Sequence, residues 1–501
     1  MKFIKYIAVG VIALMGLSSC GSDYLDTEYT EYLDSDAASD AAAKNPDVFL
    51  NGMWAWMLEF NPLNYSSNAP HDCFGIMASL HATDMMGQDI AMGASHWFNY
   101  DYLMDNRMFS YRRTKFHWVV MYTLVAKANE IIGLYPNGGE TVAVKGLLGQ
   151  AYAIRGMAYY YLIQLYQHPV TAAGAINKEA PGIPLIYTLA DGKTQEEVDA
   201  AKSRNTLGVV YAQIESDLTK AVEMLGAGYK RPSKNYINVD VANGLLARYY
   251  LLSQQWQKAA DAAARAQADE YKIMGNSGLH AGFMDIENSE WMWGFDHTTE
   301  TQTTFGSFFS MISNLTPGYA GFGYAPRLID KKLYEAIPED DYRKSLFVGA
   351  EGDMTQEMPG AQLPYANIKF GNKEDWTMDY LYMRAAEMVL IEAEAYAHLN
   401  QGGKAAQVMK KLMAQRQPSW NLANVTVDDV YLQRRIELWG EGFAFYDLKR
   451  LNKGIDRTYP GSNHLSGYKL KVEPLDVRWR YQLPLSEMQE NTLITAEDQN
   501  E

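Results

Sequence analysis

Apolar residues recur at three- and four-residue spacing along most of this chain, which is the period of an amphipathic helix. Alternating, strand-like runs are rare. The helical stretches predicted from this spacing are residues 111–135, 141–167, 206–225, 239–268, 379–399, 402–414 and 427–451. The chain is therefore predicted to be all-α, with helices at both ends of its body.

The segment between the two groups of helices has a different composition. Residues 276–371 are rich in Gly, Thr, Asn, Phe and Tyr, and only residues 290–296 alternate in the manner of a strand. We expect an irregular, loop-rich insertion here. It lies within the second part of the body, about residues 240–501, which follows a first part of about residues 45–225.

Small and aromatic residues recur at similar spacing in two of the predicted helix pairs. They are Ala247, Tyr250, Ala259, Ala263 and Ala266 in one pair, and Ala393, Tyr396, Ala405, Met409 and Leu412 in the other. This is the spacing of a tetratricopeptide unit, in which alanines let two helices approach closely. Because the pairs do not recur at a steady period, we expect about four scattered tetratricopeptide-like hairpins that form a scaffold.

The N-terminus has the pattern of an export signal. Lys2 and Lys5 precede an uncharged apolar run that is too short to span a bilayer, and Leu17-Ser18-Ser19-Cys20 follows. Small residues before a cysteine are typical of a bacterial lipoprotein signal. We therefore interpret residues 1–19 as a signal peptide and Cys20 as the lipidated first residue of the mature chain. The alternative is an ordinary secretory signal with an incidental cysteine.

A strongly acidic stretch follows this cysteine. Residues 20–44 carry seven acidic side chains and no basic residue before Lys44. Such a segment is expected to be extended, solvated and repelled by anionic lipid. We interpret residues 20–44 as a tether, and residues 45–501 as the body that it carries.

Charge and cysteine content narrow the possible functions. The chain has 44 basic and 60 acidic residues, a net charge of −16, which makes nucleic acid an unsuitable partner. Cys73 is the other cysteine besides Cys20, so the body holds no internal disulfide and depends on its core. Cys73 follows His71 and Asp72, but neighbours in sequence rarely face one another as a catalytic dyad.

Four motifs follow one another along the chain: RGMAYYYL at 155–162, YLYMRAAE at 380–387, RRIELWGEG at 434–442 and YQLPLSE at 481–487. In sequence and in order they resemble the motifs of the SusD/RagB family of nutrient-binding outer-membrane lipoproteins, except that Leu485 replaces a proline of the family. The resemblance implies a protein anchored by lipid on the extracellular face of the outer membrane. It would capture oligosaccharides and deliver them to a SusC-like TonB-dependent transporter, without a cofactor and without chemistry of its own.

Sugars present C–H faces that stack on aromatic rings, while amides and acids bind their hydroxyls. Residues 96–102, with the sequence HWFNYDY, supply both kinds of group between two predicted helices. The resemblance points to Trp97, Asn99 and Tyr100 as glycan-binding residues. The alternative is that Trp97 and Phe98 belong to the core.

A second aromatic set lies in the insertion. Its rings are interleaved with glycines, which favours an exposed, adaptable loop, and they belong to Tyr319, Phe322 and Tyr324. We expect this loop to close an aromatic arc with Trp97, as loops of this region do in the family. Trp293 is a further candidate, whereas Trp291 and Phe295 are assigned to packing.

Two other groups of charged residues invite a chemical role. Glu437 and Glu441 are four residues apart on one helix face, and two carboxylates could hydrolyse a glycoside. Basic and acidic neighbours favour an ion-pair network there instead: Arg434, Arg435, Asp447 and Arg450. His81, Asp84 and Asp89 match no compact ligand motif, so no metal is expected.

Two alternatives to glycan capture stay open at this point. The same fold could bind peptides for uptake, or the protein could be a cell-surface glycosidase with aromatic subsites of its own. Neighbouring genes would discriminate between glycan capture and peptide binding. A SusC-like transporter gene with glycosidase genes nearby favours glycan capture, whereas peptidase genes nearby favour peptide binding. The sequence does not name the sugar or its linkage.

Overall fold

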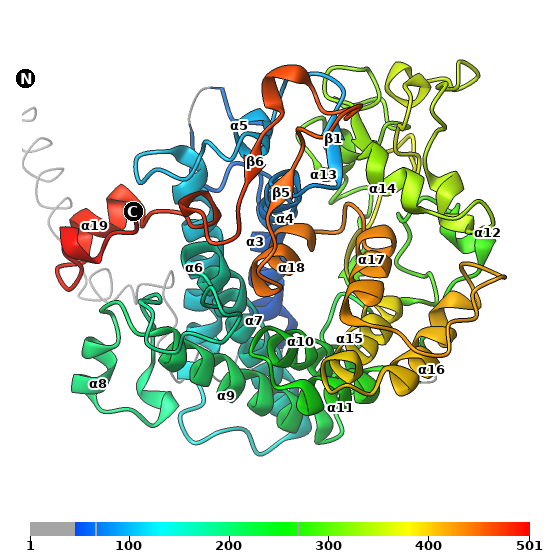
Figure 1. The fold of residues 1–501 in the computed structure, drawn as a ribbon. Helices are drawn as coiled ribbons and strands as arrows, with labels where there is room; N and C mark the ends of the chain where they lie inside the picture. Colours follow the sequence, from blue (N-terminus) through cyan, green and yellow to red (C-terminus); the bar gives the residue numbers. More distant parts are fainter. Residues whose placement is uncertain (1–45, 66–67, 269) are drawn as a thin grey trace, which may run out of the picture. The chain divides into compact units, whose positions relative to one another are not determined.

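Helices dominate the computed structural model, which describes residues 46–65, 68–268 and 270–501 (Figure 1). The expectations for the signal peptide, Cys20 and the tether lie outside these residues. The helices are α3 Pro46–Leu58, α4 Gly75–Met85, α5 Asn99–Tyr102, α6 Arg112–Gly133, α7 Val142–Tyr166, α8 Gln195–Ala200, α9 Leu207–Gly226, α10 Val239–Leu252, α11 Trp256–Ala266, α12 Asn276–Leu279, α13 Phe308–Ile312, α14 Lys331–Ala336, α15 Ala385–His398, α16 Gly402–Met413, α17 Val427–Glu437, α18 Ala444–Arg450 and α19 Leu485–Glu490. The predicted all-α class is confirmed.

Short elements complete the description. The strands are β1 Ile90–Met92, β2 Trp291–Phe295, β3 Arg327–Ile329, β4 Tyr380–Arg384, β5 Ile455–Asp456 and β6 Lys471–Val472. They form three antiparallel pairs, β1 with β3, β2 with β4 and β5 with β6. Single turns of 3-10 helix are η2 Leu189–Asp191, η3 Tyr342–Leu346, η4 Pro359–Gln362, η5 Ser466–Tyr468, η6 Val477–Trp479 and η7 Ala496–Asp498.

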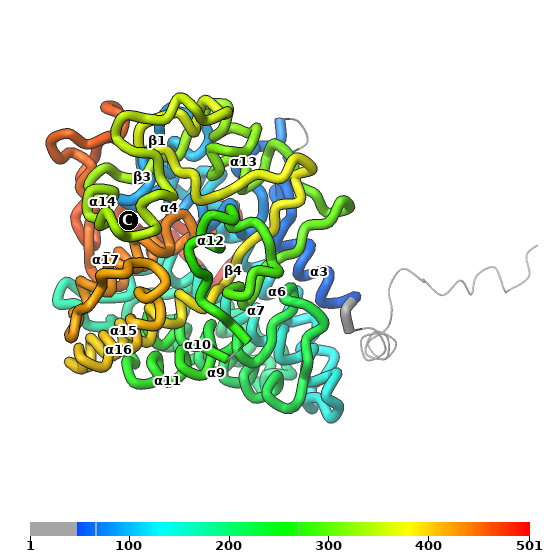
Figure 2. The backbone as a smooth tube through the Cα atoms, turned by 90° about the vertical axis from the view of Figure 1, so that its right-hand side faces the viewer, coloured from blue at the N-terminus to red at the C-terminus, as the bar shows by residue number. Residues whose placement is uncertain are grey.

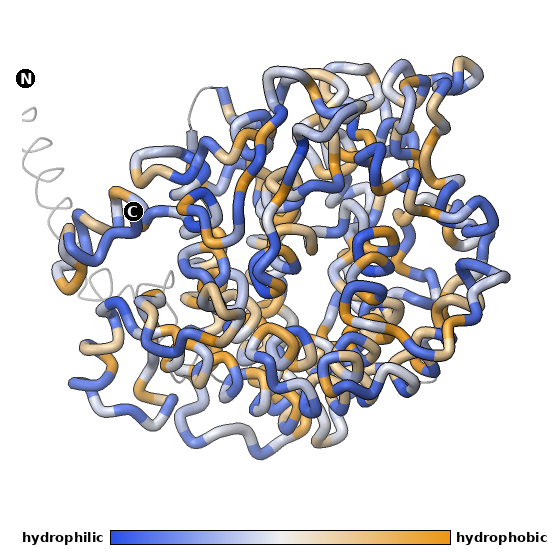
Figure 3. The backbone as a smooth tube through the Cα atoms, in the orientation of Figure 1, coloured by the Kyte–Doolittle hydropathy of each residue, from blue (hydrophilic) through white to orange (hydrophobic). Residues whose placement is uncertain are grey.

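The long helices pack side by side in chain order: α6 on α7, α7 on α9, α9 on α10, α10 on α11, α11 on α15 and α15 on α16 (Figures 1 and 2). Hydrophobic and hydrophilic residues are interspersed along these helices (Figure 3). Ala259, Ala263 and Ala405 are completely buried where the helices meet. The alanines therefore permit close packing, and the expected scaffold of tetratricopeptide-like hairpins is confirmed.

Local sequence signals explain where several of these helices begin. The Thr206 hydroxyl accepts a hydrogen bond from the backbone N–H of Val209 at the start of α9. The Asn238 side chain accepts one from Val241 at the start of α10. Each side chain satisfies a backbone donor that has no partner within its helix.

Residues 239–268 form the expected helix pair, α10 and α11, and the chain turns between them at Gln254, whose φ is +58°. Two other predicted helical stretches are wrong in part. Residues 427–451 break between α17 and α18 at Gly440 and Gly442, with φ of +77° and +91°, which glycine adopts without strain. The start of 379–399 is strand β4, because it pairs with β2.

The insertion is irregular, as expected, and β2 confirms its predicted strand. Polar side chains form hydrogen bonds with the buried backbone carbonyls of this insertion. The Asn314 amide donates to the carbonyls of Arg327 at 2.7 Å and Asn367 at 3.0 Å, and the Ser313 hydroxyl donates to Phe370 at 2.7 Å. Buried loops need such partners, because unpaired backbone groups are costly. In the residues described, no helix is both long and apolar enough to cross a membrane.

Candidate functional site

The short β1–β3 pair brings the two predicted aromatic loops together. Met92 at the end of β1 is opposite Arg327 at the start of β3, and the N–H of Gly93 donates to the carbonyl of Pro326 at 3.0 Å. Because the strands are antiparallel, the loop after β1 and the loop before β3 leave the same end of the ladder. Trp97 and Tyr319 belong to these two loops.

The buried Arg327 side chain forms hydrogen bonds with both loops. The Arg327 guanidinium donates to the carbonyl of Ala325 at 2.8 Å and to that of Trp97 at 3.3 Å, and its Nε donates to His81 at 3.3 Å. Burial lowers the pKa of Arg327 to about 9. Arg327 therefore fixes the Trp97 backbone relative to the second loop.

The glycines of the second loop hold its backbone close to its neighbours. A Cβ atom at Gly321 would lie 1.9 Å from the carbonyl oxygen of Thr316, so a side chain does not fit there. The N–H of Tyr319 donates to the Ser310 hydroxyl at 3.0 Å. The expectation of an adaptable loop is therefore wrong for the backbone, which is packed, although the rings of Phe322 and Tyr324 are exposed.

The rings of the two loops form one cluster around Trp97, which is half-buried. His71 stacks on Trp97 with ring centroids 5.9 Å apart and planes inclined by 22°. Tyr319 meets Trp97 edge to face at 6.3 Å, and its hydroxyl lies 2.9 Å from Nδ1 of His71. Tyr324 contacts Tyr319 with ring centroids 6.4 Å apart, and Phe322 contacts Tyr324 at 6.2 Å, so both rings extend the cluster. The structure thus brings Trp97 together with the three aromatic candidates of the second loop, Tyr319, Phe322 and Tyr324.

Trp97 also lines a pocket of about 590 Å3. Asn99 and the exposed ring of Tyr100 line the same pocket, so the three candidates of the first loop lie together. Tyr111 and Asp105 also line it. The pocket therefore offers aromatic faces together with an amide and a carboxylate, which is the composition that binds a small polar molecule with C–H faces.

Ion pairs form one wall of this pocket. Arg112 and Arg113 donate to the Asp72 carboxylate at 2.7 Å and 2.9 Å, and Arg113 also donates to Asp101 at 3.0 Å. Burial raises the pKa of Asp101 to about 6, against the opposing effect of Arg113. Both arginines are thus neutralised by partners, and the exposed Asp105 leaves the pocket with a negative charge.

One aromatic candidate, Trp293, belongs to the interior. Trp293 is 1 % exposed, its ring packs between Trp54 and Tyr382, and its N–H donates to the carbonyl of Asn235 at 3.1 Å. A ring covered on both sides cannot stack on a ligand, so the prediction for Trp293 is wrong. Phe98 is buried, at φ +68°, so the core alternative holds for Phe98, whereas Trp97 is half-buried.

The residues considered for metal binding or nucleophilic catalysis have structural roles instead. Asp84 accepts hydrogen bonds from the N–H groups of Gly442 and Ala444, and Asp89 pairs with Arg435. Among the described residues no cluster of His, Cys, Asp and Glu could hold a metal ion. Burial raises the pKa of Cys73 to about 12, which leaves a neutral thiol rather than a nucleophile.

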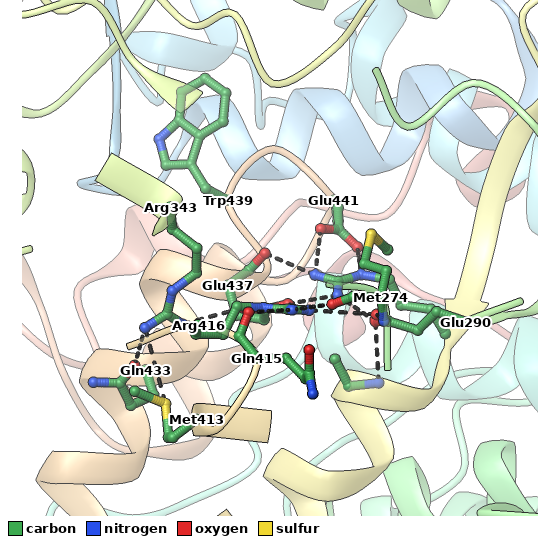
Figure 4. Close-up of polar contacts among 12 residues, drawn as sticks. Met274, Glu290, Arg343, Met413, Gln415, Arg416, Gln433, Glu437, Trp439 and Glu441 are labelled. Carbon is green, nitrogen blue, oxygen red and sulfur yellow. Dashed lines mark hydrogen bonds and ion pairs between the residues drawn. The ribbon is translucent and has the colours of Figure 1, made fainter. Parts of the chain in front are cut away.

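Glu437 and Glu441 lie in a buried ion-pair network (Figure 4). Glu437 accepts from Arg384 at 2.7 Å and from Arg416 at 2.9 Å, and Glu441 accepts from Arg384 at 2.8 Å. The expected network is therefore present, but with other partners than expected. Arg434 and Arg450 pair with Asp447 and Glu394 instead.

His71 and Phe305 are residues of the aromatic cluster that the sequence did not indicate. His71 contacts both Trp97 and Tyr319, and Phe305 packs on Tyr319 with centroids 4.4 Å apart. Both lie outside the two aromatic runs that composition indicated. His71 is close in sequence to Phe74, and Phe305 to Phe308 and Phe309. No helical or strand period there indicates that His71 and Phe305 share a cluster with Trp97.

Two family models match separate parts of this chain. One is described as "Starch-binding associating with outer membrane" and matches residues 65–251. The other is described as "SusD family" and matches residues 352–500. Together they cover more than half of the chain, which belongs to the SusD family. The resemblance predicted from the four motifs is confirmed.

Individual relatives agree with this assignment. SusD-like protein P2 of Formosa agariphila is 25 % identical over 419 residues, covering 74 % of this chain and 76 % of its own length. A SusD-like carbohydrate binding protein of Bacteroides vulgatus is 25 % identical with a TM-score of 0.76, over 92 % of this chain and 98 % of its own. Surface glycan-binding protein A of Bacteroides uniformis shares the fold with a TM-score of 0.64 at 17 % identity, over 91 % of this chain and 99 % of its own.

Proposed function

We propose that this protein is a cell-surface lipoprotein that captures neutral oligosaccharides and delivers them to a SusC-like TonB-dependent transporter in the outer membrane. The observation that carries the proposal is the half-buried ring of Trp97, which lines a pocket of about 590 Å3 beside amide and carboxylate groups. Family membership supports it, as does the 25 % identical relative that is named as carbohydrate binding.

The chemistry of the pocket suits a sugar. The Trp97 and Tyr100 rings can stack on its C–H faces, while Asn99 and Asp105 can bind adjacent hydroxyls. Arg112 and Arg113 are the arginines among the described residues that line the pocket, and both pair with carboxylates, which disfavours an acidic sugar. The net charge of −16 also disfavours a polyanion. The proposed ligand is therefore a neutral glycan.

Glu437 and Glu441, the two carboxylates four residues apart, do not have the pKa values that a glycosidase needs. Burial raises the pKa of Glu437, but Arg416 and Arg384 outweigh burial and bring it well below its usual range. The pKa of Glu441 is also lowered, by Arg384 and Lys369 against burial. A glycosidase needs one carboxylic acid whose pKa is raised so that it can give a proton to the leaving group. Neither glutamate fits that role.

Calorimetric titration of the purified protein with a panel of neutral oligosaccharides tests the proposal. We expect at least one to bind and none to be changed, so that prolonged incubation releases no new reducing ends. Reducing ends that increase with protein concentration would establish the glycosidase alternative. Binding of peptides but of no oligosaccharide would establish the peptide alternative.

The proposed anchor predicts the behaviour of Cys20→Ala. Without the cysteine no acyl chains can be attached, and firm membrane binding depends on more than one chain. We expect a precursor that is soluble or mistargeted while the body still folds. Fractionation with surface labelling measures this, and an unchanged membrane-bound, surface-exposed pool would contradict the lipoprotein assignment.

A further inference from the structure

A second hollow, of about 470 Å3, lies at α3 and the segment that follows it. Its lining combines aromatic rings with amides, as in the Trp97 pocket. Its exposed or half-buried lining residues include Ala55, Phe60, Asn235, Tyr236 and Phe295, whereas the Trp54 ring is buried. Among the described residues that line this hollow, Glu59 is the one charged residue. This composition suits a neutral polar ligand with C–H faces rather than an anion.

A line of three rings connects this hollow to the Trp97 pocket. Phe60 lines the hollow, is 39 % exposed and meets His71 edge to face with centroids 6.0 Å apart. His71 in turn stacks on Trp97 at 5.9 Å. The two hollows are therefore not isolated from each other, because aromatic surface continues from one to the other.

Phe60 is held firmly in this position. Its backbone forms an antiparallel bridge with Phe74, and the N–H of Asn61 donates to the carbonyl of Cys73 at 2.8 Å. A Cβ atom at Gly306 would lie only 2.7 Å from the Phe60 ring, so the ring packs directly on that backbone. A fixed, exposed ring loses little freedom when a ligand stacks on it.

We propose that the hollow at α3 is a second subsite for the same neutral oligosaccharide, and that a chain bound at Trp97 continues over His71 and Phe60 into it. This inference rests on the proposed function. It predicts that affinity rises with chain length. A short sugar occupies the Trp97 pocket alone, whereas a longer one also contacts Phe60 and the hollow.

The experiment titrates a length series of one neutral oligosaccharide, from disaccharide to octasaccharide, into the full-length protein in detergent. Phe60→Ala should weaken binding of the long members about threefold to tenfold, from loss of one stacking contact, and leave the short ones unchanged. Ala55→Trp, which fills the hollow from the exposed side of α3, should also remove the gain with length. Phe109→Ala is the matched control, because that ring is 37 % exposed and lines neither hollow.

The outcomes separate this inference from the proposed function. If wild-type affinity does not increase with length while Trp97→Ala weakens binding, the second subsite is wrong and the first stands. The same conclusion follows if Phe60→Ala and Ala55→Trp, both with wild-type melting temperatures, affect short and long members equally. If no member of any neutral series binds the wild type, the proposed function itself fails.

Discussion

Trp97→Ala should weaken oligosaccharide binding about tenfold to a hundredfold, or roughly 1.5–3 kcal/mol. The substitution removes the ring that lines the pocket and with it both its contact area and its attraction for C–H groups. Because Trp97 is only half-buried, the cost in folding free energy should stay near 1–2 kcal/mol, from lost contacts with His71 and Tyr319. Calorimetric titration and a melting curve on the same sample measure the two effects.

Trp293→Ala is the matched control, because its ring is the same but lies in the core. A cavity of this size should cost about 3–5 kcal/mol of stability and leave affinity per folded molecule unchanged. If Trp97→Ala showed the pattern expected for Trp293→Ala, Trp97 would be a core residue. The loop around Tyr319 would then be the remaining candidate for the binding surface.

Glu437→Gln should destabilise the fold by about 3–5 kcal/mol, because it leaves buried arginines without compensating charge. Glu437 accepts from three of them, Arg384, Arg416 and Arg343. These side chains come from β4, from the turn after α16 and from η3, so the carboxylate joins distant parts of the C-terminal region. Denaturant unfolding measures the change in free energy.

Glu473→Gln is the control for this substitution. Glu473 pairs with Lys471 at 2.7 Å, but both side chains are largely exposed, so its loss should cost less than about 1 kcal/mol. Similar small effects at the two positions would contradict the structural role of the network.

The same network makes stability depend on pH in a defined direction. The folded pKa of Glu437 is below its unfolded value, so its stabilisation is complete above about pH 4.3 and is lost as the pH falls. The melting temperature of the wild type should therefore fall more steeply below this pH than that of Glu437→Gln.

Much of the fold could be predicted because helices carry local signals. The spacing of apolar residues located the stacked helices, and Thr206 and Asn238 mark two helix starts. Strand β4 could not be predicted, because it exists only through pairing with β2, far away in the sequence. Tertiary pairing there overrides a helical pattern.

The candidate site could be predicted only in pieces. Both aromatic loops were found from their composition, but their meeting depends on the β1–β3 pair, whose strands have three residues each. Trp293 was a candidate from a strand-like run of aromatic residues, whereas Trp54 and Tyr382 pack against its ring in the interior. Burial on both faces of a strand depends on distant elements that no local pattern contains.

The most direct test of glycan capture is a crystal structure of the protein with the oligosaccharide that binds it best. We predict a sugar ring stacked on the Trp97 indole within the pocket, with hydroxyls in hydrogen-bonding distance of Asn99 or Asp105. An oligosaccharide bound at another surface, with the Trp97 pocket empty, would contradict this account.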